Sequence, residues 1–214
     1  MKHSKRILIF TGGNLESWAF ELIHQEDLLI GVDRGALFLV QHGYKPDLAL
    51  GDFDSVSEGE KAEILKQAQT FFDCDPIMKD QTDTEMALMW ALDQQPEEIL
   101  VFGALGTRFD HSLANVHLLR RSLERNIPCR IIDQYNMLQL MDRQLVVQKG
   151  AYTHVSLLPL SIEVTGITLD GFKYPLNQAT LTIGDSLGIS NLLMGPSGEI
   201  TIDSGLLLII QSKD

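Results

Sequence analysis

The stretch LLIGVDRGALFLVQHGYKPDLALGDFDS, residues 28–55, contains two short apolar runs separated by a helical pattern. Residues 28–32 and 48–50 form the apolar runs, and residues 35–42 form the helical pattern. Continuous apolar strands separated by a helix are typical of a parallel sheet that is covered on both faces. The stretch therefore predicts an α/β fold.

The same alternation extends on both sides of this stretch. Apolar runs occupy residues 7–10, 71–74, 99–102 and 130–132, and helical patterns occupy residues 58–68, 83–93 and 112–124. In the last helical pattern, Leu113, Val116, Leu119 and Leu123 predict one buried stripe. We expect residues 1–134 to form one α/β domain with a mainly parallel sheet.

The pattern changes after about residue 136, beyond which no helix start is evident. Apolar β-type segments, separated by turn residues, lie at 144–148, 154–159, 162–169, 180–183, 200–202 and 206–211. Short strands at this spacing predict a small all-β sandwich or barrel-like domain over residues 135–214.

Composition restricts the partners of the chain. With 17 basic and 29 acidic residues, its net charge is −12, which disfavours binding to nucleic acid. The one compact basic cluster, Arg120, Arg121 and Arg125, has the spacing of a solvated helix face. No apolar run approaches the roughly 20 residues that span a bilayer, and the run at 7–10 is too short for a signal peptide. We expect a cytoplasmic protein without membrane or nucleic-acid partners.

The two cysteines are too far apart from each other and from histidines to suggest a zinc site. Cys74 and Cys129 each stand alone in an apolar, strand-like segment. Both are therefore expected to be buried core thiols.

Carboxylates follow several of the predicted strands or begin the next helix. They are Asp33, Asp52, Asp54, Asp80, Asp83 and Asp110, the last of which is followed by His111. Because ligands bind outside the carboxyl ends of the strands in an open parallel sheet, we expect these side chains to converge there. Asp52 and Asp54 are expected to point the same way from an extended backbone, as a pair suited to Mg²⁺.

Each of these acids also has a structural interpretation. Thr82 with Glu85, and Ser57 with Glu60, have the spacing of helix capping boxes. Asp83 would favour the helix dipole, and Asp33 could cap the helix that follows it.

Glycine-rich turns and arginines supply the groups that a nucleoside triphosphate needs. They are Gly12, Gly13 and Asn14 after the first strand, Arg34 after Asp33, the Gly103 to Gly106 loop, and Arg108. Arg108 could instead form a surface ion pair with Asp110. Neither GxxxxGK[ST] nor GxGxxG occurs, so a P-loop kinase and a usual dinucleotide site are not supported.

Together these strings resemble the thiamine pyrophosphokinase family. The matching strings are Val32-Asp33-Arg34-Gly35-Ala36, Pro46-Asp47, Gly51-Asp52-Phe53-Asp54-Ser55, Asp80-x-Thr82-Asp83, Gly103-x-x-Gly106-x-Arg108-x-Asp110-His111 and Ser190-Asn191. The resemblance implies a Rossmann-like domain followed by a β-sandwich, in a homodimer with active sites at the interface. It implies transfer of diphosphate from ATP to the hydroxyl of thiamine, which gives thiamine diphosphate and AMP.

The resemblance also implies roles for individual residues. Asp33, Asp52, Asp54 and Asp83 resemble the catalytic acids, with Asp52, Asp54 and Asp83 as ligands of Mg²⁺. Thr82, Arg108, Asp110 and His111 resemble the nucleotide-facing positions, and Ser190 and Asn191 resemble the thiamine-facing positions, as side chains that project from a loop. The chain departs from some members in having no tryptophan near its C-terminus, because its tryptophans are Trp18 and Trp90.

In the implied mechanism, the hydroxyl attacks the β-phosphorus in line and AMP leaves, with Asp83 or Asp33 accepting the proton. Three other functions fit the residues as well. They are diphosphate transfer to another hydroxymethyl compound such as a pterin, metal-dependent phosphohydrolysis, and nucleotide sensing without turnover.

Overall fold

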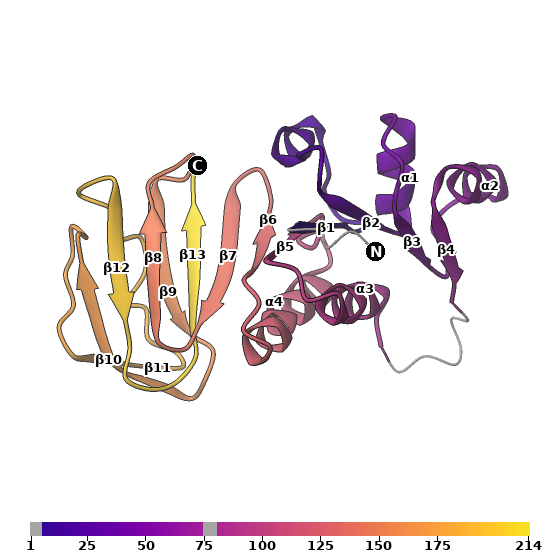
Figure 1. Cartoon of the computed structure of the whole chain (residues 1–214). Helices are drawn as coiled ribbons and strands as arrows, with labels where there is room; N and C mark the ends of the chain where they lie inside the picture. Colours follow the sequence, from indigo (N-terminus) through magenta and orange to yellow (C-terminus); the bar gives the residue numbers. More distant parts are fainter. Residues whose placement is uncertain (1–5, 75–80) are drawn as a thin grey trace. The chain divides into compact units, whose positions relative to one another are not determined.

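The computed structural model describes residues 6–74 and 81–214. The chain divides into two compact units, Met1–Gln134 and Tyr135–Asp214 (Figure 1). Asp80, one of the acids expected at the site, lies outside the described residues.

The first unit is built on a parallel sheet with the strand order β4-β3-β2-β1-β5-β6. The strands are β1 (Arg6–Phe10), β2 (Leu28–Val32), β3 (Leu48–Gly51), β4 (Thr70–Asp73), β5 (Glu98–Phe102) and β6 (Cys129–Ile132). The chain runs outward from β1 to β4 and then resumes at β5 on the other side of β1. The loops after β1 and β5 therefore flank the point where the strand order reverses, which is where open α/β sheets bind ligands.

Helices cover both faces of this sheet. They are the 3₁₀ helix η1 (Ser17–Leu22) and the α-helices α1 (Arg34–Gln41), α2 (Glu58–Gln67), α3 (Asp83–Asp93) and α4 (Phe109–Glu124). Figure 1 shows η1, α1 and α2 on one face, and α3 and α4 on the other. Covering both faces buries the central strands, so that Ile7, Leu8, Ile9 and Phe10 of β1 are inaccessible to solvent. The predicted α/β fold is confirmed.

The buried stripe predicted for α4 is wrong at its first position. Leu113 is 43% exposed, whereas Ser112 is buried together with Val116 and Leu119. The inward-facing Ser112 hydroxyl binds the backbone of the preceding loop, at Gly106.

The second unit consists of antiparallel strands in two layers. Its strands are β7 (Asn136–Met141), β8 (Gln144–Gln148), β9 (His154–Pro159), β10 (Glu163–Asp170), β11 (Ala179–Thr182), β12 (Ser197–Thr201) and β13 (Leu207–Ser212). In one layer β13 pairs with β7 and β9, and in the other the order is β11-β10-β12-β8. Both layers contribute to one apolar core, which includes Leu157, Val164, Ile200 and Ile209. The predicted small β-sandwich is confirmed.

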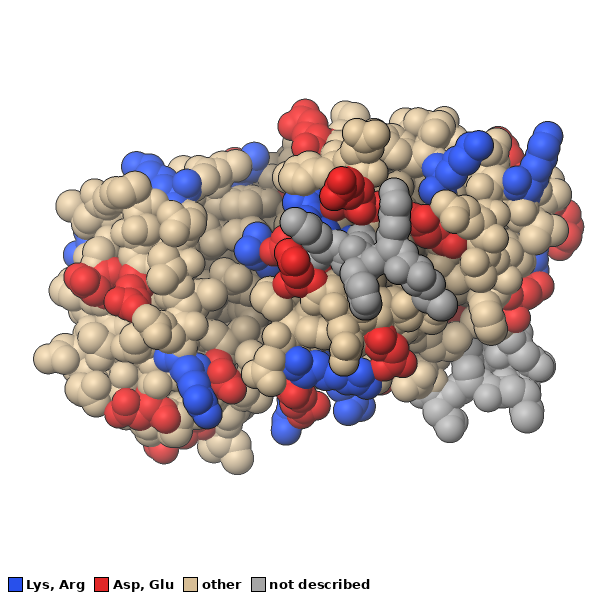
Figure 2. Space-filling view, viewed as in Figure 1, with Lys and Arg blue, Asp and Glu red and all other residues tan. Residues whose placement is uncertain are grey.

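The basic cluster on α4 is paired with carboxylates. Arg120 bonds Glu124 at 2.9 Å, Arg125 bonds Asp93 at 2.7 Å, and Arg121 lies 3.8 Å from Glu85. On the face shown in Figure 2, Lys and Arg side chains are interspersed with Asp and Glu. The interpretation as a solvated helix face is therefore confirmed.

The two cysteines differ in burial. Cys129 in β6 is buried, and burial raises the pKa of its thiol to about 12. Cys74 is only half-buried, because it follows β4 at the exposed edge of the sheet, so its expected burial was wrong.

Among the described residues, none of the helices is both long enough and apolar enough to cross a bilayer.

Candidate active site

Three acidic side chains meet at the carboxyl ends of the strands in the first unit. Asp33 follows β2, Asp52 follows β3, and Asp83 begins α3. Each offers a carboxylate oxygen, and the three oxygens lie within 4.8 Å of one another. The three residues are half-buried. We call this group the acidic cluster.

Asp33 is held in an unusual backbone conformation. Its φ of 47° is rare for a residue other than glycine, and its N–H donates to Leu50 O at 3.2 Å. The carboxylate does not cap α1; instead Oδ1 accepts the Phe53 N–H at 3.0 Å. Gly51 makes room for this carboxylate, since a Cβ on Gly51 would lie 2.0 Å from Asp33 Oδ1. The local backbone is therefore shaped around the Asp33 side chain.

Asp54 is not part of the acidic cluster. The extended backbone expected for Asp52-Phe53-Asp54 is not observed, because Phe53 has a φ of 55° and its buried ring stacks on Phe71 at 4.7 Å. Asp54 is consequently exposed in a turn, and its N–H donates to Asp52 Oδ1 at 3.2 Å. Asp33, which the metal-ligand expectation left out, completes the group instead.

Thr82 fixes the start of α3 and hence the position of Asp83. The Thr82 hydroxyl accepts the Glu85 N–H at 3.2 Å and so caps the helix. Asp83 is the first helical residue, where a negative charge is favoured by the helix dipole. Of the capping box predicted for Thr82 and Glu85, the structure shows the half that Thr82 supplies, and the expected contact of Thr82 with a nucleotide stays a prediction.

The loops after β1 and β5 are tied together at the strand-order reversal. The Gly13 N–H donates to Gly103 O at 2.9 Å, and the Asn14 N–H donates to Leu105 O at 3.4 Å. A Cβ on Gly13 would lie 2.1 Å from Gly103 O, so glycine is needed for the two loops to approach. In this structure, the two amides hold the loops together by hydrogen bonds.

Two polar residues of α4 hold the loop after β5, and sequence reasoning did not identify them. Ser112 Oγ accepts the Gly106 N–H at 3.0 Å, and Asn115 Nδ2 donates to Ala104 O at 2.8 Å. Their spacing of three residues on the helix that follows a glycine-rich loop was the available signal.

Arg108 and Asp110 form the surface ion pair that the sequence allowed. Arg108 Nη2 lies 2.6 Å from Asp110 Oδ2, and both side chains are well exposed, at 70% and 64%. Hydrogen bonding from Arg108 lowers the pKa of the Asp110 carboxyl, and the same contact raises the pKa of Arg108. Both groups therefore remain charged near neutral pH. His111 is exposed in the first turn of α4.

An open groove of about 370 Å³ lies beside the β1 loop. Its lining consists of residues 11–15, Gly106, Thr107, and Arg34, Leu37, Phe38 and Gln41 of α1. Gly12, Gly13, Asn14, Arg34 and Gly106, all expected to face a nucleotide, are thus brought together. Phe38 and Gln41 were not predicted.

Ser190 and Asn191 of the second unit have different environments. Asn191 is 5% exposed, and its side-chain amide donates to Tyr174 O at 2.7 Å and accepts the Tyr174 N–H at 3.0 Å. Ser190 is exposed at a φ of 59°, and its N–H donates to Ser156 Oγ at 3.0 Å. The expectation that both side chains project from a loop is therefore wrong for Asn191, which anchors the loop.

Comparisons with known proteins agree with this geometry. Residues 19–131 match the family model described as thiamin pyrophosphokinase, catalytic domain, and residues 143–207 match its vitamin B1 binding domain. The chain is 39% identical over 214 residues to thiamine pyrophosphokinase of Bacillus subtilis (strain 168), covering 98% of this chain and 100% of that protein. It is also similar to the crystal structure of thiamine pyrophosphokinase from Bacillus subtilis, with a TM-score of 0.92 and 38% identity. The match covers 98% of this chain and 100% of the chain in that structure. For thiamin pyrophosphokinase from Geobacillus thermodenitrificans, the TM-score is 0.88 at 36% identity, and 98% of each chain is covered.

Proposed function

The chain belongs to the thiamin pyrophosphokinase family and is therefore an ATP-dependent diphosphotransferase that acts on thiamine, and we propose that its acidic cluster holds the magnesium ion of this transfer. The observation that carries the proposal is the approach of Asp33, Asp52 and Asp83, whose carboxylate oxygens lie within 4.8 Å of one another. Like charges at this separation repel one another, and a divalent cation removes the repulsion.

The donor set suits magnesium in particular. All three donors are carboxylate oxygens, which are hard ligands that Mg²⁺ prefers over the nitrogen and sulfur ligands typical of zinc. When bound there, magnesium would neutralise the charge of ATP phosphate oxygens. We assign Asp54 to the outer side of this site, where its exposed carboxylate faces the substrate phosphates or the water around the ion.

The phosphates of ATP require donors from the chain itself. The Gly13 and Asn14 amides already donate to the loop after β5, so we assign this role chiefly to the guanidinium groups of Arg34 and Arg108. Arg34 lies in the groove and directly follows Asp33, and Arg108 begins α4. Gly12 allows the backbone of the β1 loop to approach the phosphates, and Gly103 and Gly106 shape the loop after β5. The remaining residues assigned to contact with the nucleotide are Thr82, Asp110 and His111.

We assign thiamine to the second unit, in keeping with its match to a vitamin B1 binding domain. The exposed Ser190 is a candidate contact, and Asn191 holds the backbone on which Ser190 sits. Transfer then follows from attack of the thiamine hydroxyl on the β-phosphorus, with AMP as leaving group, and Asp83 or Asp33 accepts the proton on a carboxylate oxygen that does not bind the ion.

A homodimer is also part of the proposal. The loop around Ser190 exposes the large apolar residues Ile183, Leu187, Ile189 and Met194, which are 64%, 68%, 45% and 70% exposed. Several exposed large apolar side chains in one segment are typical of an interaction site, and we assign this one to a second copy of the chain.

Measurement of AMP release at varied Mg²⁺ concentration tests the assignment of the metal site. Asp52→Asn should lower AMP release about 100-fold and raise the Mg²⁺ concentration needed for half-maximal rate, because a ligand is lost. Asp54→Asn should change the Mg²⁺ requirement less than Asp52→Asn does. Glu58→Gln, an exposed acid at the start of α2, is the control.

Full turnover of Asp52→Asn at the wild-type Mg²⁺ requirement would remove the acidic cluster from the mechanism. Measurement of phosphate release with thiamine omitted separates transfer from phosphohydrolysis, because a hydrolase releases phosphate without an acceptor alcohol.

A further inference from the structure

We propose that Phe38 and Gln41 of α1 form the subsite for the base of ATP, and that they determine which nucleotide the enzyme accepts. This inference rests on the proposed function, because it takes the triphosphate to lie at the acidic cluster. It adds two residues that the sequence motifs do not include.

The groove runs along one face of α1. Its lining includes Arg34, Leu37, Phe38 and Gln41, which are spaced at i, i+3, i+4 and i+7 and so lie on the same side of the helix. Arg34 directly follows Asp33 of the acidic cluster, which places phosphates at this end. Gln41 lies about 10 Å further along the helix axis, at about 1.5 Å per residue. The groove therefore extends away from the phosphate end, as a base joined through a ribose requires.

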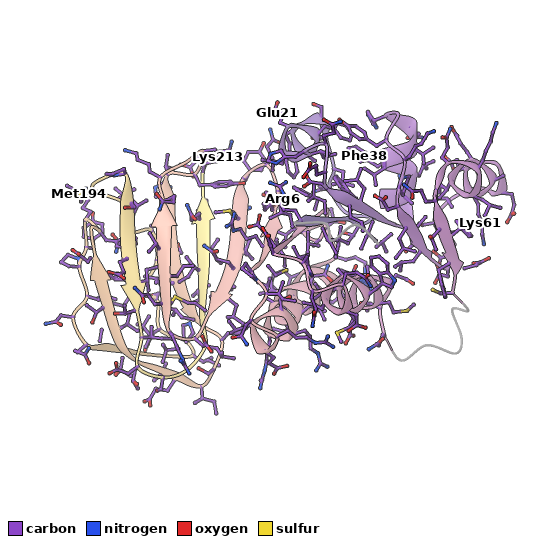
Figure 3. All side chains as sticks on the ribbon, viewed as in Figure 1. Arg6, Glu21, Phe38, Lys61, Met194 and Lys213 are labelled. Carbon is purple, nitrogen blue, oxygen red and sulfur yellow. The ribbon has the colours of Figure 1, made fainter. Side chains whose placement is uncertain are left out.

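Phe38 forms a rigid apolar wall in this groove. Its ring stacks on Phe20 of η1 at 4.8 Å with an angle of 9° between the planes, and it contacts His42 at 4.7 Å. The Phe10 ring of β1 lies 6.4 Å from that of Phe38, so Phe38 (labelled in Figure 3) is held between η1 and β1. The ring is half-buried, and it is the one aromatic side chain in the lining of the groove. A preorganised aromatic surface packs against a base at little entropic cost.

Gln41 supplies the polar contact that an apolar wall lacks. It is exposed at the last turn of α1, and its side-chain amide offers both donors and an acceptor, which match the edge of a nucleobase. Gly106 and Thr107 also line the groove, and the Gly106 N–H donates a hydrogen bond to the Ser112 hydroxyl. With about 370 Å³, the groove is within the usual range of about 300–1,000 Å³ for small-molecule sites.

Two single variants, Phe38→Leu and Gln41→Leu, test the subsite in the full-length enzyme. We expect each to raise the KM for ATP, by about tenfold for Phe38→Leu, with kcat and the KM for thiamine within about twofold of wild type. Inhibition by inorganic triphosphate, which has no base, should keep its wild-type inhibition constant in both variants.

Tyr44→Leu is the matched control. Tyr44 stacks on Phe20 at 4.9 Å in the same aromatic group but does not line the groove. Its replacement should lower the melting temperature and leave the KM for ATP unchanged. Gln41→Leu changes an exposed side chain and decides the question even if Phe38→Leu fails to fold.

Two results would overturn the inference: an unchanged KM for ATP in Gln41→Leu and in any folded Phe38→Leu, or equal weakening of ATP and inorganic triphosphate binding. In either case the proposed function would stand as long as Asp52→Asn lowers AMP release about 100-fold. Full turnover of Asp52→Asn at the wild-type Mg²⁺ requirement would instead remove the premise on which the subsite rests.

Discussion

At the scale of single residues, Gly51 couples the backbone to the acidic cluster. It has a φ of 145°, and a Cβ there would lie 2.0 Å from Asp33 Oδ1. Gly51→Ala should therefore displace the Asp33 carboxylate, destabilise the fold by about 1–3 kcal/mol and lower AMP release by about 100-fold. Thermal unfolding and the AMP assay measure the two effects.

Gly59 provides the matched glycine for this experiment. It lies in α2, and a Cβ there would meet no atom within 4 Å. Gly59→Ala should raise stability by up to about 1 kcal/mol and leave AMP release unchanged. Equal behaviour of the two alanine variants would show that Gly51 is not required by Asp33.

The cysteines should differ in reactivity because they differ in burial. Burial raises the pKa of Cys129 to about 12, so its reactive thiolate is nearly absent at pH 8, whereas Cys74 is half-buried. We expect mass spectrometry after alkylation at pH 8 to find label on Cys74 in the native protein, and on both cysteines after denaturation. Equally fast native labelling of Cys129 would contradict this description of the core.

The sequence predicted all three members of the acidic cluster, and it wrongly added Asp54 to them, which has a physical cause. Asp33 and Asp52 were expected at the site because each directly follows a buried strand, and Asp83 because it begins the helix α3. Asp54 was misplaced because Phe53 adopts a positive φ, which its residue type disfavours and which is stabilised by packing on Phe71. Tertiary contacts of this kind are not visible in the spacing of carboxylates.

At the scale of elements, the caps of α2 and α3 provide a matched pair. Ser57 and Glu60 form a complete capping box on α2, and Thr82 caps α3 immediately before Asp83. Ser57→Ala and Thr82→Ala should each destabilise the protein by about 1 kcal/mol at pH 7. Only Thr82→Ala should also raise the Mg²⁺ requirement, because it loosens the helix start that positions Asp83.

The contribution of Glu60 to the α2 cap should depend on pH. Hydrogen bonds from Ser57 lower the pKa of Glu60 below its ordinary value of 4.5. The stabilisation is therefore fully present above that value and is lost as the pH falls through the lower, folded-state pKa. Ser57→Ala removes the hydrogen bond from the hydroxyl and keeps the one from the backbone N–H, so we expect NMR titration to show a Glu60 pKa that is higher than in the wild type but still below its ordinary value; an unchanged pKa would show that the Ser57 hydroxyl does not bind Glu60 in solution.

Elements with a clear pattern of apolar residues in the sequence were predicted, and elements without such a pattern were missed. The apolar runs that became β1, β2 and β5 are buried on both faces of the sheet, so their signal was continuous. The short 3₁₀ helix η1 has one buried residue, Ala19, and no periodicity that could identify it. β7 was missed because buried and exposed residues do not alternate along it. Two half-buried positions separate its buried ones.

At the scale of the whole molecule, the apolar loop of the second unit predicts self-association. Leu187→Glu combined with Met194→Glu should convert a dimer into a folded monomer, because both side chains are at least 68% exposed in the single chain. Light scattering coupled to gel filtration gives the mass, and circular dichroism confirms the fold. Leu65→Glu, which changes an exposed leucine on α2, is the control and should remain dimeric.

A monomeric wild-type protein, or a dimer that persists in the double variant, would contradict this prediction. The sequence patterns predicted both fold types, but they contain no signal for a partner. The exposed apolar side chains became evident only once the strands around them were in place.

The account as a whole depends on one divalent cation shared by Asp33, Asp52 and Asp83. Crystals grown with Mn²⁺, thiamine and a non-hydrolysable ATP analogue test this directly through the anomalous signal of manganese. We predict a peak at coordination distance, about 2 Å, from oxygens of the acidic cluster and of the bound phosphates. A manganese peak elsewhere in the phosphate site, with the three carboxylates uncoordinated, would contradict the account.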